Sequence, residues 1–167
     1  MILALDASIS STGFALVDFD DSLIDFGKIT TTTKMEEDDR VYYIANTIAN
    51  IMDKHFVTDV VMEAQFFSRN VKTAMQLSRL RGAITFVIKS RGVNIIHRTP
   101  SEIRKDLTGN GSATKEEVCD YIRDFYKNDD RIVELGELID RQCKAKNSDI
   151  YDAIGIGLSY NKTLKKG

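Results

Sequence analysis

The chain has 167 residues, of which 43% are hydrophobic and 29% charged, and its formal net charge at pH 7 is −2. A chain of this length buries roughly two thirds of its unfolded surface, so we expect one domain with a substantial core over residues 1–167. The sequence has no long apolar run and no basic leader followed by an apolar stretch, which predicts a cytoplasmic protein without a membrane span. Cys119 and Cys143 lack the spacing of a metal site, and no secretory context favours a disulfide.

The chain begins with an apolar run, residues 1–5, that ends in the carboxylate of Asp6. This run is too short for a helix and has no helical period, so it predicts a strand buried on both faces. A carboxylate at the tip of such a strand is costly unless it is paired or holds a cation, although an Asp that caps the following turn is an ordinary alternative. Segments 12–19 and 23–32 are β-rich, and the acidic turn between them predicts an antiparallel meander with the first strand.

Helical and strand patterns alternate through the middle of the chain. Apolar spacing and capping residues predict helices over 41–56 and 71–90, a short helix that starts at Pro100, and a helix from Thr114 to about residue 126. Strands are expected over 59–63 and 93–99, and residues 129–146 are expected to be partly helical. The strand over 59–63 repeats the opening pattern, because its apolar residues lead into the carboxylate of Glu63.

The last predicted element is a helix over 147–160 with Asp149 and Asp152 in its first turn. Their spacing places both carboxylates on one helical face, at the positive end of the helix dipole. Acids favour a helix N-terminus in any protein, so this pair alone also has a purely structural explanation. Two glycines in the same helix cost roughly 1 kcal/mol each relative to alanine, and close packing of the helix on the sheet is the simplest reason for them. Such packing would bring Asp149 and Asp152 to the sheet edge.

Charge is unevenly distributed along the chain. Residues 66–105 carry nine Lys or Arg and one acid, a local balance of +8, whereas residues 18–39 carry eight acids and two lysines, a balance of −6. This asymmetry predicts a positive face for a polyanion and an acidic face turned elsewhere. The alternative is that the charges lie on solvated helix faces without a partner molecule.

Carboxylates stand at the ends of several predicted elements. Like charges at one place repel each other and raise each other's pKa, so such a cluster persists mainly when hard cations lie among it. Ligands that offer only oxygen atoms select Mg²⁺ or Mn²⁺ over zinc, and two such ions can activate a water and stabilise the leaving oxygen of a phosphodiester. Together with the basic segment, this set predicts nucleic-acid hydrolysis. Its four members are Asp6, Glu63, Asp149 and Asp152.

The ordered set of motifs resembles the RuvC-type Holliday-junction resolvases of the ribonuclease H superfamily, over nearly the whole chain. The resemblance rests on Asp6 with Gly13, on the segment 63–70 followed by Ala74, Leu77 and Arg81-Gly82, on the segment 109–115, and on the segment 149–153. It implies an α/β fold, a ribonuclease H-like five-stranded mixed sheet flanked by helices, and a homodimer. It further implies that the four carboxylates hold two Mg²⁺ per active site, with Mn²⁺ as a substitute, and that the enzyme cleaves symmetric strands of four-way DNA junctions. Forks and flaps are further candidate substrates.

The same resemblance assigns DNA contacts. Phe66 matches the aromatic residue that stacks on unpaired bases at the crossover, and Arg104 and Lys115 match basic residues that approach the scissile phosphate. Backbone contacts are expected from Arg69, Asn70, Lys72 and Lys105. Each residue also has an ordinary interpretation: Phe66 as a core hydrophobe, Arg104 as a helix surface charge, and Lys115 as a residue that merely follows a cap.

The chain departs from the family's usual motif at two places. Ala7-Ser8 stands where the family usually has Pro-Gly, and Arg104 stands where it usually has lysine. The sequence preference of cleavage therefore does not follow from the resemblance. The compact chain and the divergent motif suggest a phage-encoded member, which would act in the host cytoplasm.

Two other functions fit part of the pattern. Asp6 followed by a turn rich in Ser, Thr and Gly is similar to the first phosphate loop of actin-like ATPases and sugar kinases, but the second glycine-rich loop of those proteins and their usual length are missing. A catalytically silent protein that only binds junctions is the other alternative, and the presence of all four acids disfavours it.

Overall fold

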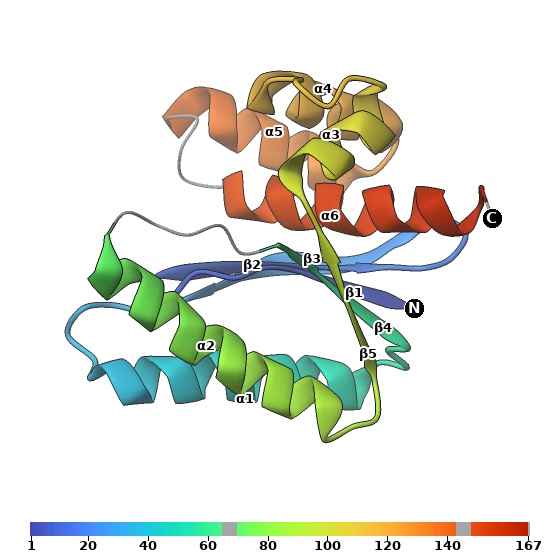
Figure 1. Ribbon diagram of the computed structural model, residues 1–167. Helices are drawn as coiled ribbons and strands as arrows, with labels where there is room; N and C mark the ends of the chain where they lie inside the picture. The colour runs from blue at the N-terminus through green and yellow to red at the C-terminus, as the bar shows by residue number, and fades with distance from the viewer. Residues whose placement is uncertain (65–69, 143–147, 167) are drawn as a thin grey trace.

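A five-stranded mixed sheet forms the centre of the computed structural model, which describes residues 1–64, 70–142 and 148–166, with only the backbone for 137–142 (Figure 1). The strand order is β3-β2-β1-β4-β5. The three N-terminal strands pair antiparallel, as the predicted meander requires, and β4 and β5 extend the sheet in parallel from β1. The strands are β1 (Ile2–Asp6), β2 (Ser11–Val17), β3 (Leu23–Thr30), β4 (Asp59–Glu63) and β5 (Asn94–Arg98).

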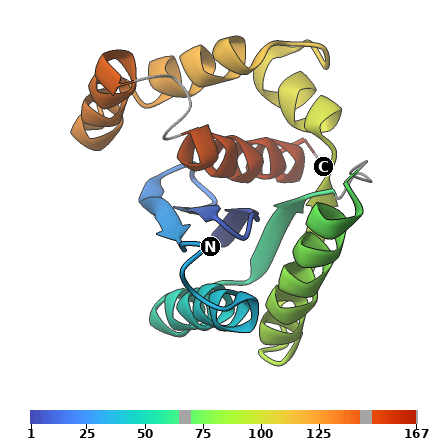
Figure 2. The same ribbon diagram turned by 90° about the vertical axis from the view of Figure 1, so that its left-hand side faces the viewer.

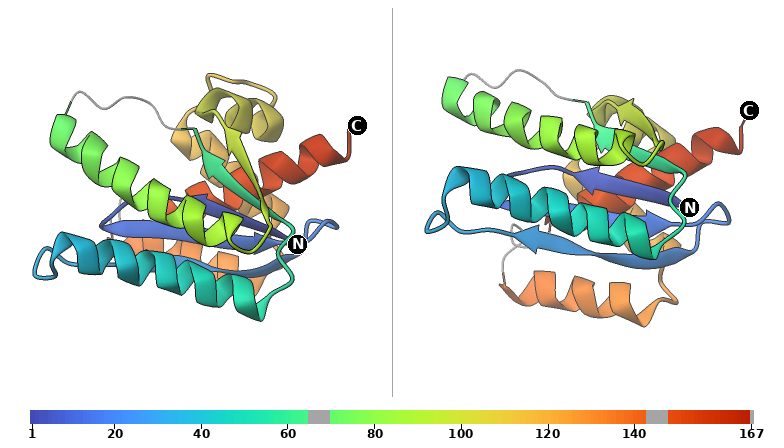
Figure 3. Two further views of the ribbon diagram at one scale, coloured as in Figure 1. Left: turned by 60° about the horizontal axis from the view of Figure 1, so that its bottom comes forward. Right: turned by 90° about the horizontal axis from the view of Figure 1, so that it is seen from below.

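Helices cover both faces of the sheet (Figure 2). On one face α1 and α2 lie side by side (Figure 3), and on the other α6 lies on the sheet with α3, α4 and α5 outside it. Their bounds are α1 (Glu37–Lys54), α2 (Val71–Lys89), α3 (Pro100–Thr108), α4 (Lys115–Phe125), α5 (Asp130–Gln142) and α6 (Ser148–Leu164). Within the described ranges, no helix has the length and apolar character that a membrane crossing requires.

Most helix ends follow local sequence signals. Thr114 and Glu117 form the predicted capping box of α4, and Thr99 and Glu102 form a second one at α3, with Pro100 at its start. The start of α1 differs from the prediction, which placed it at Val41. The helix begins at Glu37 because the polar tract before Val41 supplies acids to its first turn, where the helix dipole favours negative charge.

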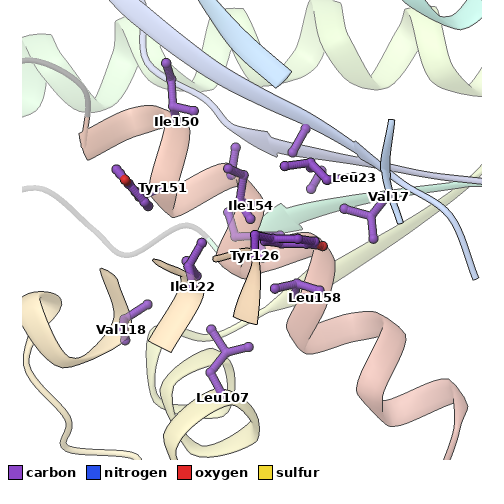
Figure 4. Close-up of a cluster of buried hydrophobic side chains, with 14 of the residues drawn as sticks. Val17, Leu23, Leu107, Val118, Ile122, Tyr126, Ile150, Tyr151, Ile154 and Leu158 are labelled. Atoms are coloured by element: carbon purple, nitrogen blue, oxygen red, sulfur yellow. The ribbon is translucent and has the colours of Figure 1, made fainter. Parts of the chain in front are cut away.

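The sheet separates two hydrophobic cores. Residues of β1 alternate between them: Ile2 and Ala4 face the core under α6, whereas Leu3 and Leu5 face the core under α1 and α2. All four side chains are fully buried, which confirms the predicted strand with two buried faces. Figure 4 shows the core under α6, where Ile154 of that helix lies among residues of the sheet, α3 and α4.

The two glycines of α6 have different neighbours. A Cβ at Gly157 would lie 2.9 Å from Val17 Cγ2 and 3.2 Å from Ala4 Cβ, so this glycine lets α6 pack closely on the sheet, as predicted. Gly155 faces the opposite way, toward α3 and α4, where an added Cβ would make ordinary contacts of 3.4 Å or more. Close packing on the sheet therefore explains only one of the two.

Part of the acidic segment meets the basic segment, so the prediction that the acidic face turns elsewhere is wrong for Glu37 and Asp38. Arg79 of α2 pairs with Glu37 at 2.7 Å and with Asp38 at 2.5 Å, both in the first turn of α1. Arg91, just beyond α2, pairs with Asp53 at 2.8 Å. These contacts arise because α1 and α2 lie side by side, and they neutralise part of the segment that was expected to bind a polyanion.

Candidate functional site

Two strand tips place a pair of carboxylates at one edge of the sheet. In the parallel pairing of β1 with β4, Leu5 lies opposite Met62, and the next residue of each strand is Asp6 or Glu63. Both acids are only partly buried, whereas the residues before them are in the core. The pairing register therefore brings the two predicted carboxylates together.

The N-terminal end of α6 adds two more carboxylates to this edge, Asp149 in the first turn and Asp152 three residues later. One ligand oxygen each from Asp6, Asp149 and Asp152 can be chosen so that all lie within 4.8 Å of one another. Glu63 is outside this tight group, but it is close enough for its charge to raise the pKa of Asp6. All four acids predicted from the sequence thus lie at one site, three of them at a spacing that suits a shared cation.

The surroundings of the site disfavour the ionised forms of its carboxylates. Burial, followed by the charges of Asp152, Glu63 and Asp149, raises the pKa of Asp6 to about 7. Burial and the charge of Asp152 raise the pKa of Glu63, and burial also raises the pKa of Asp152. Raised pKa values mean that too little positive charge surrounds these carboxylates to stabilise their ionised forms. A divalent cation bound among them would supply that charge.

Two cations from other elements reach the same site. Lys115, the first residue of α4, donates from Nζ to Asp152 Oδ2 at 2.5 Å. Burial lowers the pKa of Lys115, but the hydrogen bond and the charges of Asp152 and Asp6 outweigh this and raise it overall. Arg104 of α3 lies near enough to lower the pKa of Glu63 and of Asp152 against the upward effect of burial.

These charged groups help to line a pocket with a volume of about 280 Å³. Its lining combines carboxylates of β1, β4 and α6 and both cations with apolar residues. The lining residues are Asp6, Glu63, Arg104, Lys115, Asp152, Pro100, Ile103, Val118, Gly155 and Ile156. The pocket therefore offers oxygen ligands for a metal, cations for a phosphate, and apolar side chains beside them.

Of the other predicted DNA contacts, the described residues Asn70, Lys72 and Lys105 are not among those that line this pocket. Phe66 and Arg69 lie outside the described residues, so the structure does not place them. Asn70 caps α2, since its side-chain oxygen accepts from the Thr73 amide at 3.2 Å. Lys72 and Lys105 are exposed on α2 and α3.

Arg81 is a charged neighbour of the site that was not among the predicted site residues. It is partly buried, its charge lowers the pKa of Glu63 against the upward effect of burial, and its guanidinium lies 3.2 Å from Nδ1 of His97. A signal was present in the sequence, because Arg81 falls on the same helical face as the buried Ile84 and Ile88. A charge on the apolar face of a helix requires a partner, and Glu63 supplies it.

The donor set fits a hard divalent cation. Each of the four acids offers carboxylate oxygens, and the described residues within ligand distance include no cysteine or histidine. Such a set selects Mg²⁺ or Mn²⁺ over softer metals. The arrangement therefore combines possible metal ligands with cations that could attract a phosphate.

Comparisons with known sequences agree on one family. The family model described as crossover junction endodeoxyribonuclease RuvC matches residues 2–159. A curated relative of that name from Halothermothrix orenii is 27% identical over 168 residues, which cover 99% of this chain and 94% of the relative. Another from Helicobacter pylori is 30% identical, with 98% of each chain covered.

Solved structures share the fold. The chain of Thermus thermophilus RuvC in complex with a Holliday junction substrate superposes with a TM-score of 0.79 at 21% identity, covering 99% of this chain and 95% of that one. The yeast mitochondrial Holliday junction resolvase superposes with a TM-score of 0.69 at 11% identity, covering 99% and 79%. The ribonuclease H-like fold expected from the sequence is thereby confirmed.

Proposed function

The chain belongs to the RuvC family of crossover junction endodeoxyribonucleases, and we propose that it is a metal-dependent endonuclease that resolves four-way DNA junctions by paired hydrolysis of phosphodiester bonds. The observation that carries this proposal is the convergence of Asp6, Asp149 and Asp152 within 4.8 Å, beside Glu63 and two cations. Carboxylates hold the metal that phosphodiester hydrolysis uses, and the cations attract the phosphate.

Asp6, Glu63, Asp149 and Asp152 would hold two Mg²⁺ ions per active site, with Mn²⁺ as a substitute. Bound there, the ions would activate a water and stabilise the leaving oxygen. The raised pKa values of Asp6, Glu63 and Asp152 support this assignment, because added positive charge would restore their ionised forms. Mg²⁺ requires near-octahedral geometry, so the spacing of these ligands matters for activity.

The two cations of the pocket have separate tasks in this proposal. Arg104 binds a nonbridging phosphate oxygen, for which its planar guanidinium supplies paired donors. Lys115 lies next to Asp152 and so orients that carboxylate while its charge attracts the DNA backbone. The exposed Lys72 and Lys105, with Asn70 and Arg69, extend the contacts along the DNA arms.

Selection of branched DNA needs a further element, because duplex and junction present the same phosphates. Phe66 follows Glu63 by three positions and would stack on a base that is unpaired at the crossover. Stacking of this kind contributes about 1–3 kcal/mol per base. Four-way junctions, and also forks and flaps, supply such bases.

The proposed enzyme is a homodimer, because two cuts in strands of like polarity need two active sites related by a twofold axis. Helix α2 is the proposed interface. Its outer face exposes Val71, Met75 and Phe86, whose exposed fractions are 71%, 62% and 74%. Large apolar side chains along one exposed helix face favour burial against a second copy.

Sedimentation tests the dimer. We expect Met75→Glu and Phe86→Glu to produce monomers that still bind Mg²⁺, because the metal ligands lie on other elements. Phe56→Glu is the matched control, since Phe56 is 85% exposed but lies outside α2. A wild-type chain that sediments as a monomer both alone and on a junction would contradict the dimer.

Cleavage of a labelled four-way junction tests the function. We expect symmetric nicks in Mg²⁺ or Mn²⁺, none in EDTA, and much less cleavage of a linear duplex with the same sequence. Binding without cleavage would favour the silent junction-binding protein instead. ATP calorimetry tests the actin-like alternative, although the hydroxyl of Thr12, at the start of β2, already donates to the Ser8 carbonyl at 2.7 Å. The cytoplasmic location and the phage origin stay predictions.

A further inference from the structure

Gly13 lies between two parts of the metal centre. In the antiparallel pairing of β1 with β2 it is directly opposite Asp6. On its other side it faces the first turn of α6, where a Cβ built on Gly13 would lie 2.0 Å from the backbone oxygen of Asp149 and 2.5 Å from its carbonyl carbon. Real Cβ atoms essentially never approach within 3.0 Å of another heavy atom, so only glycine is compatible with this arrangement.

The clash at Gly13 differs in kind from those at other tightly packed glycines. Near Gly27 the closest atoms are ring carbons of Phe14, at 3.0 and 3.1 Å, and a ring can rotate. Near Gly157 the closest atoms belong to side chains of Val17 and Ala4. At Gly13 they belong to the backbone of a residue that carries one of the clustered carboxylates, so relief requires the first turn of α6 to move.

We propose that Gly13 is a positioning residue of the metal centre: the absence of a side chain there lets the first turn of α6 lie against β2 and sets the distance from Asp6 to Asp149 and Asp152. An alanine would push this turn away from the sheet by about 1 Å or more, since its Cβ needs at least that much added distance. The ligand group spans only 4.8 Å, and Mg²⁺ tolerates little departure from octahedral geometry. This inference deepens the proposed function and relies on its metal centre.

The test compares Gly13→Ala with Gly157→Ala, which changes a second glycine between α6 and the sheet. Calorimetry without DNA measures Mg²⁺ affinity, thermal unfolding in EDTA measures stability, and cleavage is followed over a range of Mg²⁺ concentrations. For Gly13→Ala we expect Mg²⁺ affinity to fall about 10- to 100-fold, as for other residues that orient metal ligands. Cleavage should fall steeply at low Mg²⁺ and recover in part as Mg²⁺ is raised, while junction binding in EDTA should stay unchanged.

For Gly157→Ala we expect a lower unfolding temperature, because the added methyl would overpack against Val17 and Ala4. Its Mg²⁺ affinity should stay within about twofold of the wild type, because these neighbours are not metal ligands. Folded Gly13→Ala protein with normal Mg²⁺ affinity would overturn the proposal. Equal losses of Mg²⁺ affinity in both variants would overturn it too, since α6 packing in general would then be the cause. A Gly13→Ala chain that fails to fold would show that this glycine serves stability instead.

The metal readout separates this inference from the proposed function. Wild-type protein that binds Mg²⁺ but cleaves no branched DNA would contradict the proposed function and leave the inference about Gly13 standing. Loss of Mg²⁺ affinity in Gly13→Ala would still show that Gly13 positions the ligands. Cleavage of junctions by a Gly13→Ala variant with unchanged Mg²⁺ dependence would contradict the inference about Gly13 and leave the proposed function standing.

Discussion

Helices α1 and α6 both carry acidic residues near their N-termini, but these residues have different surroundings. Both carry acids at the helix N-terminus, where the dipole favours them. In α1, Glu37 and Asp38 pair with Arg79 near the surface. In α6, Asp149 and Asp152 approach Asp6 at the sheet edge, where burial and like charge raise carboxylate pKa values. An acidic first turn is therefore a local signal for a helix start, and only its neighbours decide whether it can also hold a metal.

The pKa directions show the same contrast. The pKa of Glu37 is lowered, mainly by its hydrogen bond from Gln76 and also by Arg79, so its ionised form is stable. The pKa of Asp152 is raised, mainly by burial, even though Lys115 opposes the shift. The acids at the start of α1 therefore have enough positive charge around them, whereas those at the start of α6 do not. An added cation fits the acids of α6.

The largest expected difference is between removing a carboxylate of the site and removing one at the start of α1. We expect Asp6→Asn, Glu63→Gln, Asp149→Asn or Asp152→Asn to reduce junction cleavage by about a thousandfold or more, because each removes a metal ligand worth several kcal/mol in the transition state. Junction binding should be unchanged or slightly tighter, since one charge near the phosphates is gone. Matched changes in the α1 turn, Glu37→Gln and Asp38→Asn, should leave cleavage intact. Normal cleavage by two of the four site variants would contradict the assignment.

A substitution at Phe66 tests the recognition of branched DNA without changing the metal ligands near the start of α6. We expect Phe66→Ala to weaken junction cleavage roughly ten- to a hundredfold, because a stacking contact is lost. Mg²⁺ affinity and the salt dependence of binding should hardly change, since no charge is altered. Phe66→Tyr should retain much of the activity. If Phe66→Ala cut junctions normally or failed to fold, Phe66 would be a core residue.

Opposite pH dependence is expected from the two regions in the metal-free protein. The pKa of Asp6 is about 7 in the folded chain and 3.8 when unperturbed, so the folded state binds more protons between these values and loses stability as pH rises from about 4 to about 7. Glu37, with a lowered pKa, contributes stability above its ordinary value of 4.5 that is lost as pH falls. In EDTA, Asp6→Asn should flatten the decline toward pH 7, as measured by chemical unfolding. An unchanged profile would show that Asp6 does not cause it.

The smallest effect is expected at Arg79. Its side chain is 54% exposed, and exposed ion pairs contribute at most about 1 kcal/mol. Arg79→Ala should therefore lower the free energy of unfolding by less than about 1 kcal/mol and leave cleavage and junction affinity unchanged. Arg104→Ala is the informative counterpart, because Arg104 lines the pocket and its loss should weaken cleavage. Weaker junction binding by Arg79→Ala would contradict this prediction and indicate that Arg79 contacts DNA.

Local sequence was sufficient for much of the fold and for the identity of the four acids. The apolar run before Asp6 predicted a strand with two buried faces, and β1 has both faces in the core. Caps and Pro100 located α3 and α4, because these signals act within one helical turn. Carboxylates at the ends of elements were recognisable because charge is costly beside buried strands.

Tertiary structure decided the contacts that local pattern does not encode. Helices α1 and α6 both have acids near their N-termini, yet only those of α6 meet Asp6, because pairing register and helix packing bring residues 6 and 149 together. For the same reason, the charge of Arg81 acts on Glu63, and Arg79 pairs with acids that were expected to face elsewhere. The contact of Gly13 with the Asp149 backbone also depends on how closely α6 lies on β2. Distances between residues far apart in the chain are set by packing, which periodicity and capping do not determine.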